Sequence, residues 1–451
     1  MSDAALPRST AHAGQDSLEH SILIRVLARA FLAGEPTVEE IVVRASLALG
    51  RPWRWLRPVA ERYVESSRDS TRPRHRDVVG FLRQDRGVRR ALRKYRRSLT
   101  VDQWLSGPQQ MQPVAAAETW AVPAIESVDA LANWLSVAPN ELDWFADLKG
   151  LVSRKNTPEP LRHYRYRILT RRSGGIRLIE APKPHLKGLQ RHVLDRILNG
   201  VPAHPAVHGF LKGHSIKTFT APHVGQRVVL RMDLRDFFPS ISGARVQSFF
   251  RTVGYPDSVA DLLGGICTNA VPADIRGQLG DARTLYSRPH LPQGAPTSPA
   301  LATVCFYRAA CRLAGLAKSA GAEYTRYADD LAFSGGEKFD RCVTRFSTHV
   351  AVILHEEGFA VNHRKTRIMR QGVRQHLAGL VTNQRVNIMR ADFDRLKAIL
   401  TNCIRLGPES QNREAHPRFR LHLEGRVGFV ESINPARGQH LRALFNRITW
   451  Q

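Results

Sequence analysis

Residues 323–335, EYTRYADDLAFSG, decide the fold because they place two adjacent acids, Asp329 and Asp330, between two short apolar and aromatic runs. Such runs on either side of a polar pair are typical of a β-hairpin with a tight turn. A further acid, Asp233, ends the strand-like run RVVLRMD at residues 227–233. A strand that ends in an acid near this hairpin tip would bring three carboxylates to one point.

Carboxylates gathered at one point suit a hard metal ion. Mg²⁺ takes oxygen ligands in octahedral geometry and completes its shell with water and phosphate. Two such ions can activate an attacking hydroxyl and stabilise the leaving oxygen of an in-line phosphoryl displacement. A lone Asp-Asp pair is more typical of an ordinary polar turn, and Asp233 is what favours a metal site here. We therefore expect Asp233, Asp329 and Asp330 to hold two Mg²⁺ ions, with Mn²⁺ as an alternative.

The charge of the chain indicates the kind of partner. The 451 residues include 67 Lys and Arg against 40 Asp and Glu, a formal net charge of +27. An excess of this size favours nucleic acid, although a generally Arg-rich proteome would give the same composition. No apolar run approaches a membrane span, and the N-terminus has no apolar segment typical of a secretion signal. We therefore expect a cytoplasmic protein with no membrane partner.

Composition and periodicity divide the chain into segments. Residues 1–16 are small and polar and are predicted to be disordered. Apolar residues three or four apart predict a basic helical domain over 17–105, and Gly, Gln and Pro predict a linker over 106–125. Strand-like runs alternate with helical stretches over 126–390, and 391–451 is helical again. The pattern predicts an α+β fold with an N-terminal helical extension.

The end of the helical extension is strongly basic. Between Arg72 and Arg97 lie eleven Arg or Lys and only two acids, Asp77 and Asp85. This stretch is either the solvated face of a helix or a surface that contacts phosphates, and the sequence leaves both interpretations open.

Six motifs occur in an order that resembles the conserved blocks of bacterial reverse transcriptases. They are YRILTRRSGGIRLIEAPKPHLKGLQRHVLDRIL at 166–198, RMDLRDFFPSI at 231–241, LPQGAPTSPALA at 291–302, RYADDLAFSG at 326–335, VNHRKTRI at 361–368 and LAGLVTNQRVNI at 377–388. The resemblance covers about residues 126–451 and is strongest to the retron type, with group II intron relatives second. It implies a right-hand polymerase: fingers and a palm with an antiparallel sheet over 126–390, and a helical thumb over 391–451.

The resemblance also assigns roles to residues near the metal ions. It makes Asp233, Asp329 and Asp330 the metal-binding acids and lets the backbone carbonyl of Leu234 complete a metal site. It gives Lys365 the role of protonating the pyrophosphate leaving group. The alternative is that Lys365 is simply another exposed basic residue.

Four further positions match the nucleotide site of the family. Arg177 corresponds to the finger arginine that grips the triphosphate, and Asp236 to a backbone N–H that meets it. Phe238 corresponds to the steric gate that crowds a ribose 2′-OH, although a core aromatic is the alternative. Gln293 corresponds to a loop residue that contacts the incoming deoxynucleotide.

Two blocks depart from the usual retron pattern. Residues 219–223, FTAPH, keep only His223 of the usual Asn-Ala-x-x-His, and residues 377–379, LAG, replace the usual Val-Thr-Gly. These positions are associated in the family with recognition of the retron's own RNA. The departures favour the alternatives of a group II intron-like or other defence-associated reverse transcriptase. A catalytically silent, maturase-like RNA-binding scaffold is the third reading.

The function that the resemblance implies is RNA-directed DNA synthesis. The expected template is a dedicated, structured non-coding RNA, and the expected product is RNA-linked single-stranded DNA with a role in antiphage defence. The expected partners are this RNA, the RNA–DNA hybrid and deoxynucleoside triphosphates, with an effector protein as an open option. A basic channel between fingers, palm and thumb would hold the hybrid through its backbone.

Overall fold

The computed structural model describes residues 10–33, 37–66, 75–96, 98–103, 111–154, 157–170 and 176–450. The chain divides into two compact units. The first comprises Met1–Thr119, Pro123–Trp144 and Phe250–Leu263, and the second comprises Trp120–Val122, Phe145–Phe249 and Gly264–Gln451. The predicted disordered segment 1–16 and linker 106–125 lie partly outside the described residues. The predicted domain boundaries stay predictions.

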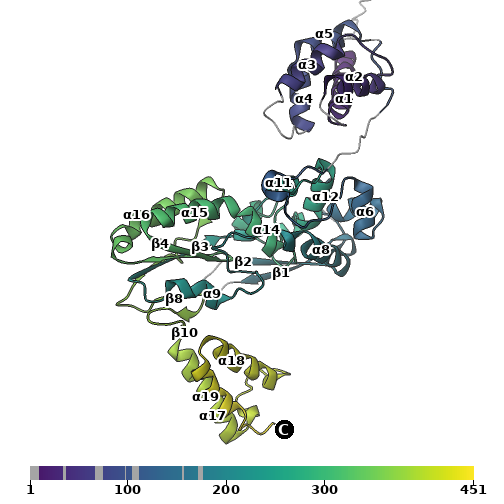
Figure 1. Cartoon of the computed structure of the whole chain (residues 1–451). Helices are drawn as coiled ribbons and strands as arrows, with labels where there is room; N and C mark the ends of the chain where they lie inside the picture. The colour runs from purple at the N-terminus through teal and green to yellow at the C-terminus, as the bar shows by residue number, and fades with distance from the viewer. Residues whose placement is uncertain are drawn as a thin grey trace, which may run out of the picture. The chain divides into compact units, whose positions relative to one another are not determined.

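The first unit begins with a group of amphipathic helices around an apolar core of its own (Figure 1). These helices are α1 (Thr10–Leu32), α2 (Val38–Ala48), α3 (Leu56–Ser66), α4 (His75–Gln84) and α5 (Arg86–Lys94). The core includes Leu27, Ile41 and Leu82, each at most 1% exposed. Burial of such side chains holds short helices together that would not persist alone in water. The helices α6 (Val128–Leu135) and α7 (Pro139–Ala146) follow along the chain.

The second unit is built on an antiparallel sheet. Its strands are β3 (Val228–Arg235), β4 (Ala322–Tyr327), β5 (Asp330–Gly335), β6 (Ala360–Val361) and β7 (Arg367–Arg370), in the order β4-β5-β3-β6, with β7 also paired to β3. The helices α15 (Tyr307–Ala320) and α16 (Glu337–Glu356) cover one face of the sheet (Figure 1). Phe333 of β5 is fully buried between Tyr324 and Phe346. The predicted α+β palm with an antiparallel sheet is therefore present.

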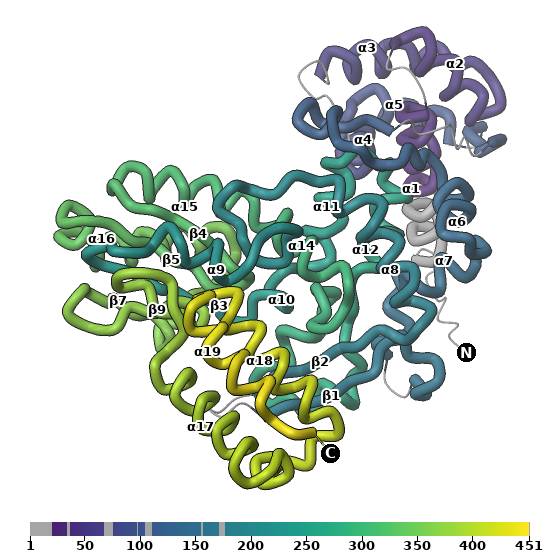
Figure 2. The backbone as a smooth tube through the Cα atoms, turned by 60° about the horizontal axis from the view of Figure 1, so that its bottom comes forward, coloured from purple at the N-terminus to yellow at the C-terminus, as the bar shows by residue number. Residues whose placement is uncertain are grey.

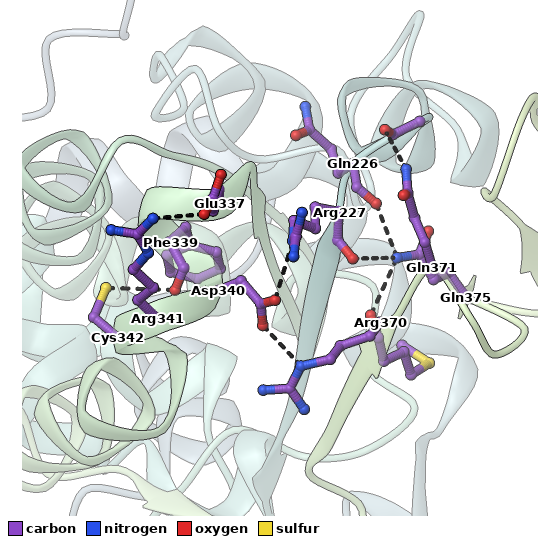
Figure 3. Close-up of polar contacts among 12 residues, drawn as sticks. Gln226, Arg227, Glu337, Phe339, Asp340, Arg341, Cys342, Arg370, Gln371 and Gln375 are labelled. Carbon is purple, nitrogen blue, oxygen red and sulfur yellow. Dashed lines mark hydrogen bonds and ion pairs between the residues drawn. The ribbon is translucent and has the colours of Figure 1, made fainter.

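Ion pairs fix the end of this sheet that lies away from the acids. Asp340 of α16 accepts hydrogen bonds from Arg227, just before β3, and from Arg370 of β7, at 3.3 and 2.8 Å (Figure 3). Nearby, the buried side chain of Gln375 donates to the backbone carbonyl oxygens of Gln226 and Met369 at 2.9 and 3.1 Å. These contacts join β3, β7 and α16, so the register of β3 is held from this end.

The segments that precede and interrupt the sheet form a second group of elements. A hairpin of β1 (Tyr164–Thr170) and β2 (Ile176–Pro182) leads into α8 (Pro184–Arg196). The remaining helices are α9 (Ile216–Thr220), α10 (Phe237–Ser240), α11 (Gly243–Val253), α12 (Asp257–Cys267), α13 (Ala273–Arg276) and α14 (Ser298–Cys305). The tip of the hairpin, residues 171–175, lies outside the described residues.

The chain ends in a helical group with its own core. The small strands β8 (His376–Leu377), β9 (Leu380–Val381) and β10 (Asn387–Ile388) form a separate sheet and precede α17 (Arg390–Leu406), α18 (Phe419–Ile433) and α19 (Pro435–Phe445). The three helices run close together in Figure 2 and bury an apolar cluster that includes Leu400, Leu423 and Leu441. This is the helical C-terminal segment that the sequence predicts.

Among the described residues, no single helix is long and apolar enough to cross a membrane, although the bent pair of α14 and α15 meets the length and composition for a broken span.

Candidate active site

The strand register brings the predicted acids together. Asp233 of β3 stands directly opposite Asp330 of β5, and Tyr327 pairs with Asp330 across the hairpin. Ala328 and Asp329 therefore form a two-residue turn, in which Ala328 takes the left-handed φ of 55°. The amide of Leu234 donates to the backbone oxygen of Asp329 at 2.9 Å and ties the turn to β3. The hairpin predicted from the sequence is present, with its acids at the tip.

Each of the two paired acids holds a cationic side chain. Lys365 Nζ lies 2.9 Å from Asp233 Oδ2, and Asn362 Nδ2 donates to Asp233 Oδ1 at 3.0 Å. Arg231, two residues before Asp233 on the same face of β3, donates to Asp330 Oδ1 from Nε and Nη2 at 3.0 and 2.9 Å. These contacts offset the repulsion between the neighbouring carboxylates, which are largely shielded from water.

The carboxyl of Asp329 is affected by its burial and by the neighbouring acids. Burial raises its pKa, and the negative charges of Asp233 and Asp330 raise it further. Within the described ranges, however, no set of three or more His, Cys, Asp or Glu side chains is arranged as a ready-made metal site.

A buried arginine lies behind the hairpin tip. Arg326 of β4 is 1% exposed, and its Nη1 donates to the backbone oxygen of Ala328 at 3.0 Å. Its guanidinium lies 4.6 Å from the ring centre of Phe306, a cation–π contact. Burial lowers the pKa of Arg326 to about 10, and the charge of Asp329 acts in the opposite direction. Arg326 therefore remains a cation at neutral pH and holds the strained turn from beneath.

His223 joins the two strands of the hairpin from within the core. Its Nε2 lies 2.7 Å from Thr325 Oγ1 of β4, and its Nδ1 lies 2.6 Å from Ser334 Oγ of β5. Since the Thr325 hydroxyl already donates to the backbone oxygen of Phe219, we infer that Nε2 carries the proton and Nδ1 accepts from Ser334. Burial lowers the pKa of His223 to about 3, so the ring is neutral.

A pocket of about 370 Å³ contains two of the predicted nucleotide-site residues. Phe238 and Gln293 both line it, together with Phe210 and the loop that leads into α14. The ring centre of Phe210 lies 6.4 Å from that of Phe238 and 6.2 Å from that of Tyr327, next to the acids. Phe210 therefore connects the pocket lining with Tyr327, the last residue of β4 before the acids.

Two cations of α8 also line this pocket, Lys187 and Arg191. They lie four residues apart and therefore project from one face of the helix. The predicted triphosphate ligand Arg177 is exposed on β2 and is absent from the pocket lining. Asp236 takes the left-handed φ of 47° at the start of α10, where its carboxylate pairs with Arg235 at 3.4 Å. The structure thus groups Phe238 with Gln293 and leaves Arg177 apart.

Close backbone approaches at two glycines shape the site. A Cβ at Gly209 would lie 2.6 Å from the amide nitrogen of Ala328, so only glycine lets this segment pass beside the turn. A Cβ at Gly294 would lie 2.8 Å from the oxygen of Glu180, and its φ is 137°. The Gln293 loop is held at this point by a hydrogen bond from the Glu180 amide to the Gln293 oxygen, at 2.9 Å.

Sequence motifs located the acids, Lys365, Phe238 and Gln293, but not the groups around them. The supporting residues that the motifs missed are Arg231, Asn362, Arg326, Phe210, Lys187 and Arg191. All of them except Phe210 lie within the quoted motifs, which contain these residues without indicating their roles. Their contacts with the acids and with the pocket depend on the fold.

A family model described as "Reverse transcriptase (RNA-dependent DNA polymerase)" matches residues 167–390. The retron Mx65 reverse transcriptase of Myxococcus xanthus is 42% identical over 289 residues, which are 63% of this chain and 64% of that protein. This chain therefore spans slightly less than two thirds of that relative.

Two further relatives show the same similarity. The retron Mx162 reverse transcriptase of Myxococcus xanthus is 33% identical over 72% of this chain and 67% of its own length. The retron Ec86 reverse transcriptase of Escherichia coli is 31% identical over 63% of this chain and 82% of its own length. A solved structure of a foamy viral protease-reverse transcriptase in complex with an RNA/DNA hybrid aligns over 64% of this chain and 32% of that one. The sequence identity is 15% and the TM-score is 0.31, a weak structural similarity.

Arg231→Ala should destabilise the metal-free protein, because it leaves Asp330 without its cation. The expected cost is about 1–3 kcal/mol, and it should shrink when Mg²⁺ is added, because a bound cation would take over the same carboxylate. Thermal unfolding with EDTA and with Mg²⁺ measures the difference. Arg227→Ala is the matched control, since its partner Asp340 lies away from the acids. An Arg231→Ala cost that is equal with and without Mg²⁺ would contradict the expectation.

The folded protein should lose stability as the pH falls, through His223. Its pKa is about 3 when folded against 6.5 for the free side chain, so between these values the unfolded state binds the extra proton. From pH 7.5 to 5.5 the wild type should lose about 1.4 kcal/mol more than His223→Asn. Urea unfolding at both pH values measures this. Parallel pH profiles for the two proteins would show that His223 is not buried as a neutral ring.

Proposed function

This chain belongs to the retron reverse transcriptases, a family of RNA-directed DNA polymerases, and on that premise we propose that its acid cluster catalyses the addition of deoxynucleotides to a primer. The predicted family and the predicted right-hand polymerase fold are confirmed. The observation that carries the proposal is the pairing of Asp233 with Asp330 across β3 and β5, beside a pocket lined by Phe238 and Gln293.

We propose that the acid cluster binds a divalent cation, although the described side chains are not arranged as a ready-made metal site. Asp233 and Asp330 face each other and each already binds a cationic side chain, while the pKa of Asp329 is raised by burial and by their charges. A group of acids that attracts Lys365 and Arg231 in this way attracts metal ions by the same force. We propose that Asp233, Asp329 and Asp330, with the carbonyl of Leu234, would hold two Mg²⁺ ions. When bound, these would lower the pKa of the primer hydroxyl and neutralise charge on the phosphates.

Lys365 supplies a proton donor at the edge of the cluster. Its ammonium group lies 2.9 Å from Asp233 Oδ2, and its side chain is about half exposed. An exposed ammonium on a flexible stem can turn from a carboxylate toward a phosphate. We propose that it gives a proton to the pyrophosphate oxygen when the bond between the α- and β-phosphates breaks.

The pocket is proposed to bind the incoming deoxynucleoside triphosphate. Phe238 would stand against the sugar and leave no room for a 2′-OH, and Gln293 would contact the nucleotide from the opposite loop. Lys187 and Arg191 supply positive charge for the phosphates, and the backbone N–H of Asp236 would add a donor. Arg177 would reach the triphosphate only if the hairpin of β1 and β2 carried it there, so it is the least supported of these residues.

Membership of the retron family supports a proposal about the finer function. We propose that a structured non-coding RNA is the template, that an RNA–DNA hybrid is held in the basic channel, and that RNA-linked single-stranded DNA is the product. A role in antiphage defence, an effector protein as a partner and a cytoplasmic location belong to the same proposal. The altered blocks at 219–223 and 377–379 lie outside the acids and the pocket, and Phe219, His223 and Leu377 are fully buried.

Asp329→Asn/Asp330→Asn should abolish DNA synthesis and leave RNA binding largely intact, because binding rests on the basic surface. The test is to express the chain with its native flanking DNA, purify it and sequence the nucleic acid that copurifies. Wild type should carry RNA-linked DNA and the variant RNA alone. Glu323→Gln, an exposed acid of the same hairpin, is the matched control and should behave as wild type. RNA without DNA from wild type, even with added dNTPs and Mg²⁺, would leave only the scaffold reading.

Phe238→Ala should admit ribonucleotides, because it removes the ring that would meet the 2′-OH. Incorporation of rNTP relative to dNTP should rise by at least tenfold, a discrimination of about 1.4 kcal/mol. Single-nucleotide primer extension with each substrate measures the ratio. Phe210→Ala, a second aromatic of the pocket, is the control. An unchanged ratio in Phe238→Ala would mean that the ring is only a packing residue.

A further inference from the structure

The helix α5 of the first unit carries a basic surface that the active site does not use. Its nine residues, RGVRRALRK, include five Arg or Lys and no acid. Val88, Ala91 and Leu92 are buried in the core of the unit, which leaves every charge on the outer side. The exposed basic residues are Arg86, Arg89, Arg90, Arg93 and Lys94, and we call them the α5 stripe.

The charge of the α5 stripe is not balanced by the described acids of the unit. Across the described part of the chain, no ion pair joins a member of the stripe to a carboxylate. The nearest acid in sequence, Asp85, is already engaged: it accepts hydrogen bonds from Arg62 at 2.8 and 3.0 Å and from the Val88 amide at 2.9 Å. These bonds, with the Arg62 charge, lower the pKa of Asp85 against the opposing effect of burial. The stripe therefore presents an uncompensated positive charge.

The residue types on the α5 stripe indicate which kind of anionic partner it binds. A helix that binds a membrane surface inserts an exposed apolar face, but the apolar face of α5 is buried. A site for single-stranded nucleic acid stacks bases on aromatic rings. Arg86–Lys94 contains none, and the ring of Tyr95, which follows, packs against Trp53, with its centre 5.3 Å from Lys94 Nζ. Four of the five cations are arginines, which bind phosphate oxygens in bidentate pairs. On a rigid helix about 13 Å long, they match the regular backbone of a duplex.

We propose that the α5 stripe binds the phosphate backbone of double-stranded nucleic acid, as a second contact outside the polymerase site. Its partner chemistry is the paired stem of a folded RNA, which is read through phosphates and shape, not sequence. The contact needs neither the acids nor a nucleotide, so it stands whether or not the polymerase proposal does.

The variant that tests this is Arg86→Gln/Arg90→Gln/Arg93→Gln in the full chain. Gln keeps helix propensity, and thermal unfolding checks the fold. The matched control is Arg25→Gln/Arg54→Gln/Arg57→Gln, which removes the same charge from exposed positions of the same unit. Binding of a fully paired RNA hairpin is measured in EDTA over a range of salt. The slope of log Kd against log salt should fall by about 2–3 in the α5 variant only. Equal slopes for variant and control would overturn the proposal.

A footprint locates the contact independently. Lys94 lies within the stripe, and Lys338 is an exposed lysine of α16 that serves as reference. The RNA hairpin should protect Lys94 from acylation, measured by mass spectrometry, and leave Lys338 reactive. A paired DNA hairpin in a second arm distinguishes recognition of any duplex from recognition of RNA, and protection by either supports the proposal. Protection of Lys94 by polyglutamate or by anionic vesicles, but by neither hairpin, would overturn it in favour of an acidic protein or a membrane.

Discussion

The balance of charge around three neighbouring carboxylates is the constraint on which the site depends. At an effective dielectric constant of about 20, two unit charges about 4 Å apart repel by about 4 kcal/mol, a large part of the stability of a domain. Cationic side chains at fixed positions offset this repulsion. Lys365 pairs with Asp233, Arg231 pairs with Asp330, and the buried Arg326 donates to the backbone of the turn.

The hairpin tip depends in turn on packing behind it. Ala328 takes a left-handed conformation that an L-residue adopts at some cost, and Arg326 and the passing segment at Gly209 hold it there. His223 joins β4 to β5 through two hydroxyl groups, so the strands cannot slip against each other without breaking buried hydrogen bonds. Rigid support of this kind is what a catalytic group of acids needs.

The chain carries its positive charge in two different ways. Within the second unit, Lys187, Arg191, Arg231 and Lys365 lie near the acids or the pocket, where each has a partner or a proposed ligand. In the first unit, the cations of α5 form no ion pair with any carboxylate among the described residues and lie on the unit's own helical core.

The sequence alone determined the acids, the hairpin and the family, because these depend on local spacing: two acids between short strand-like runs, and motifs in a fixed order. It also indicated Phe238 and Gln293, and the pocket contains both. Only the tertiary structure decided which cations balance which acid, since Arg231 meets Asp330 across 99 residues of chain and Lys365 meets Asp233 across 132. It also separated Arg177 from the pocket and showed that the apolar side of α5 is buried. Contacts of this range depend on strand register and burial, which no local pattern specifies.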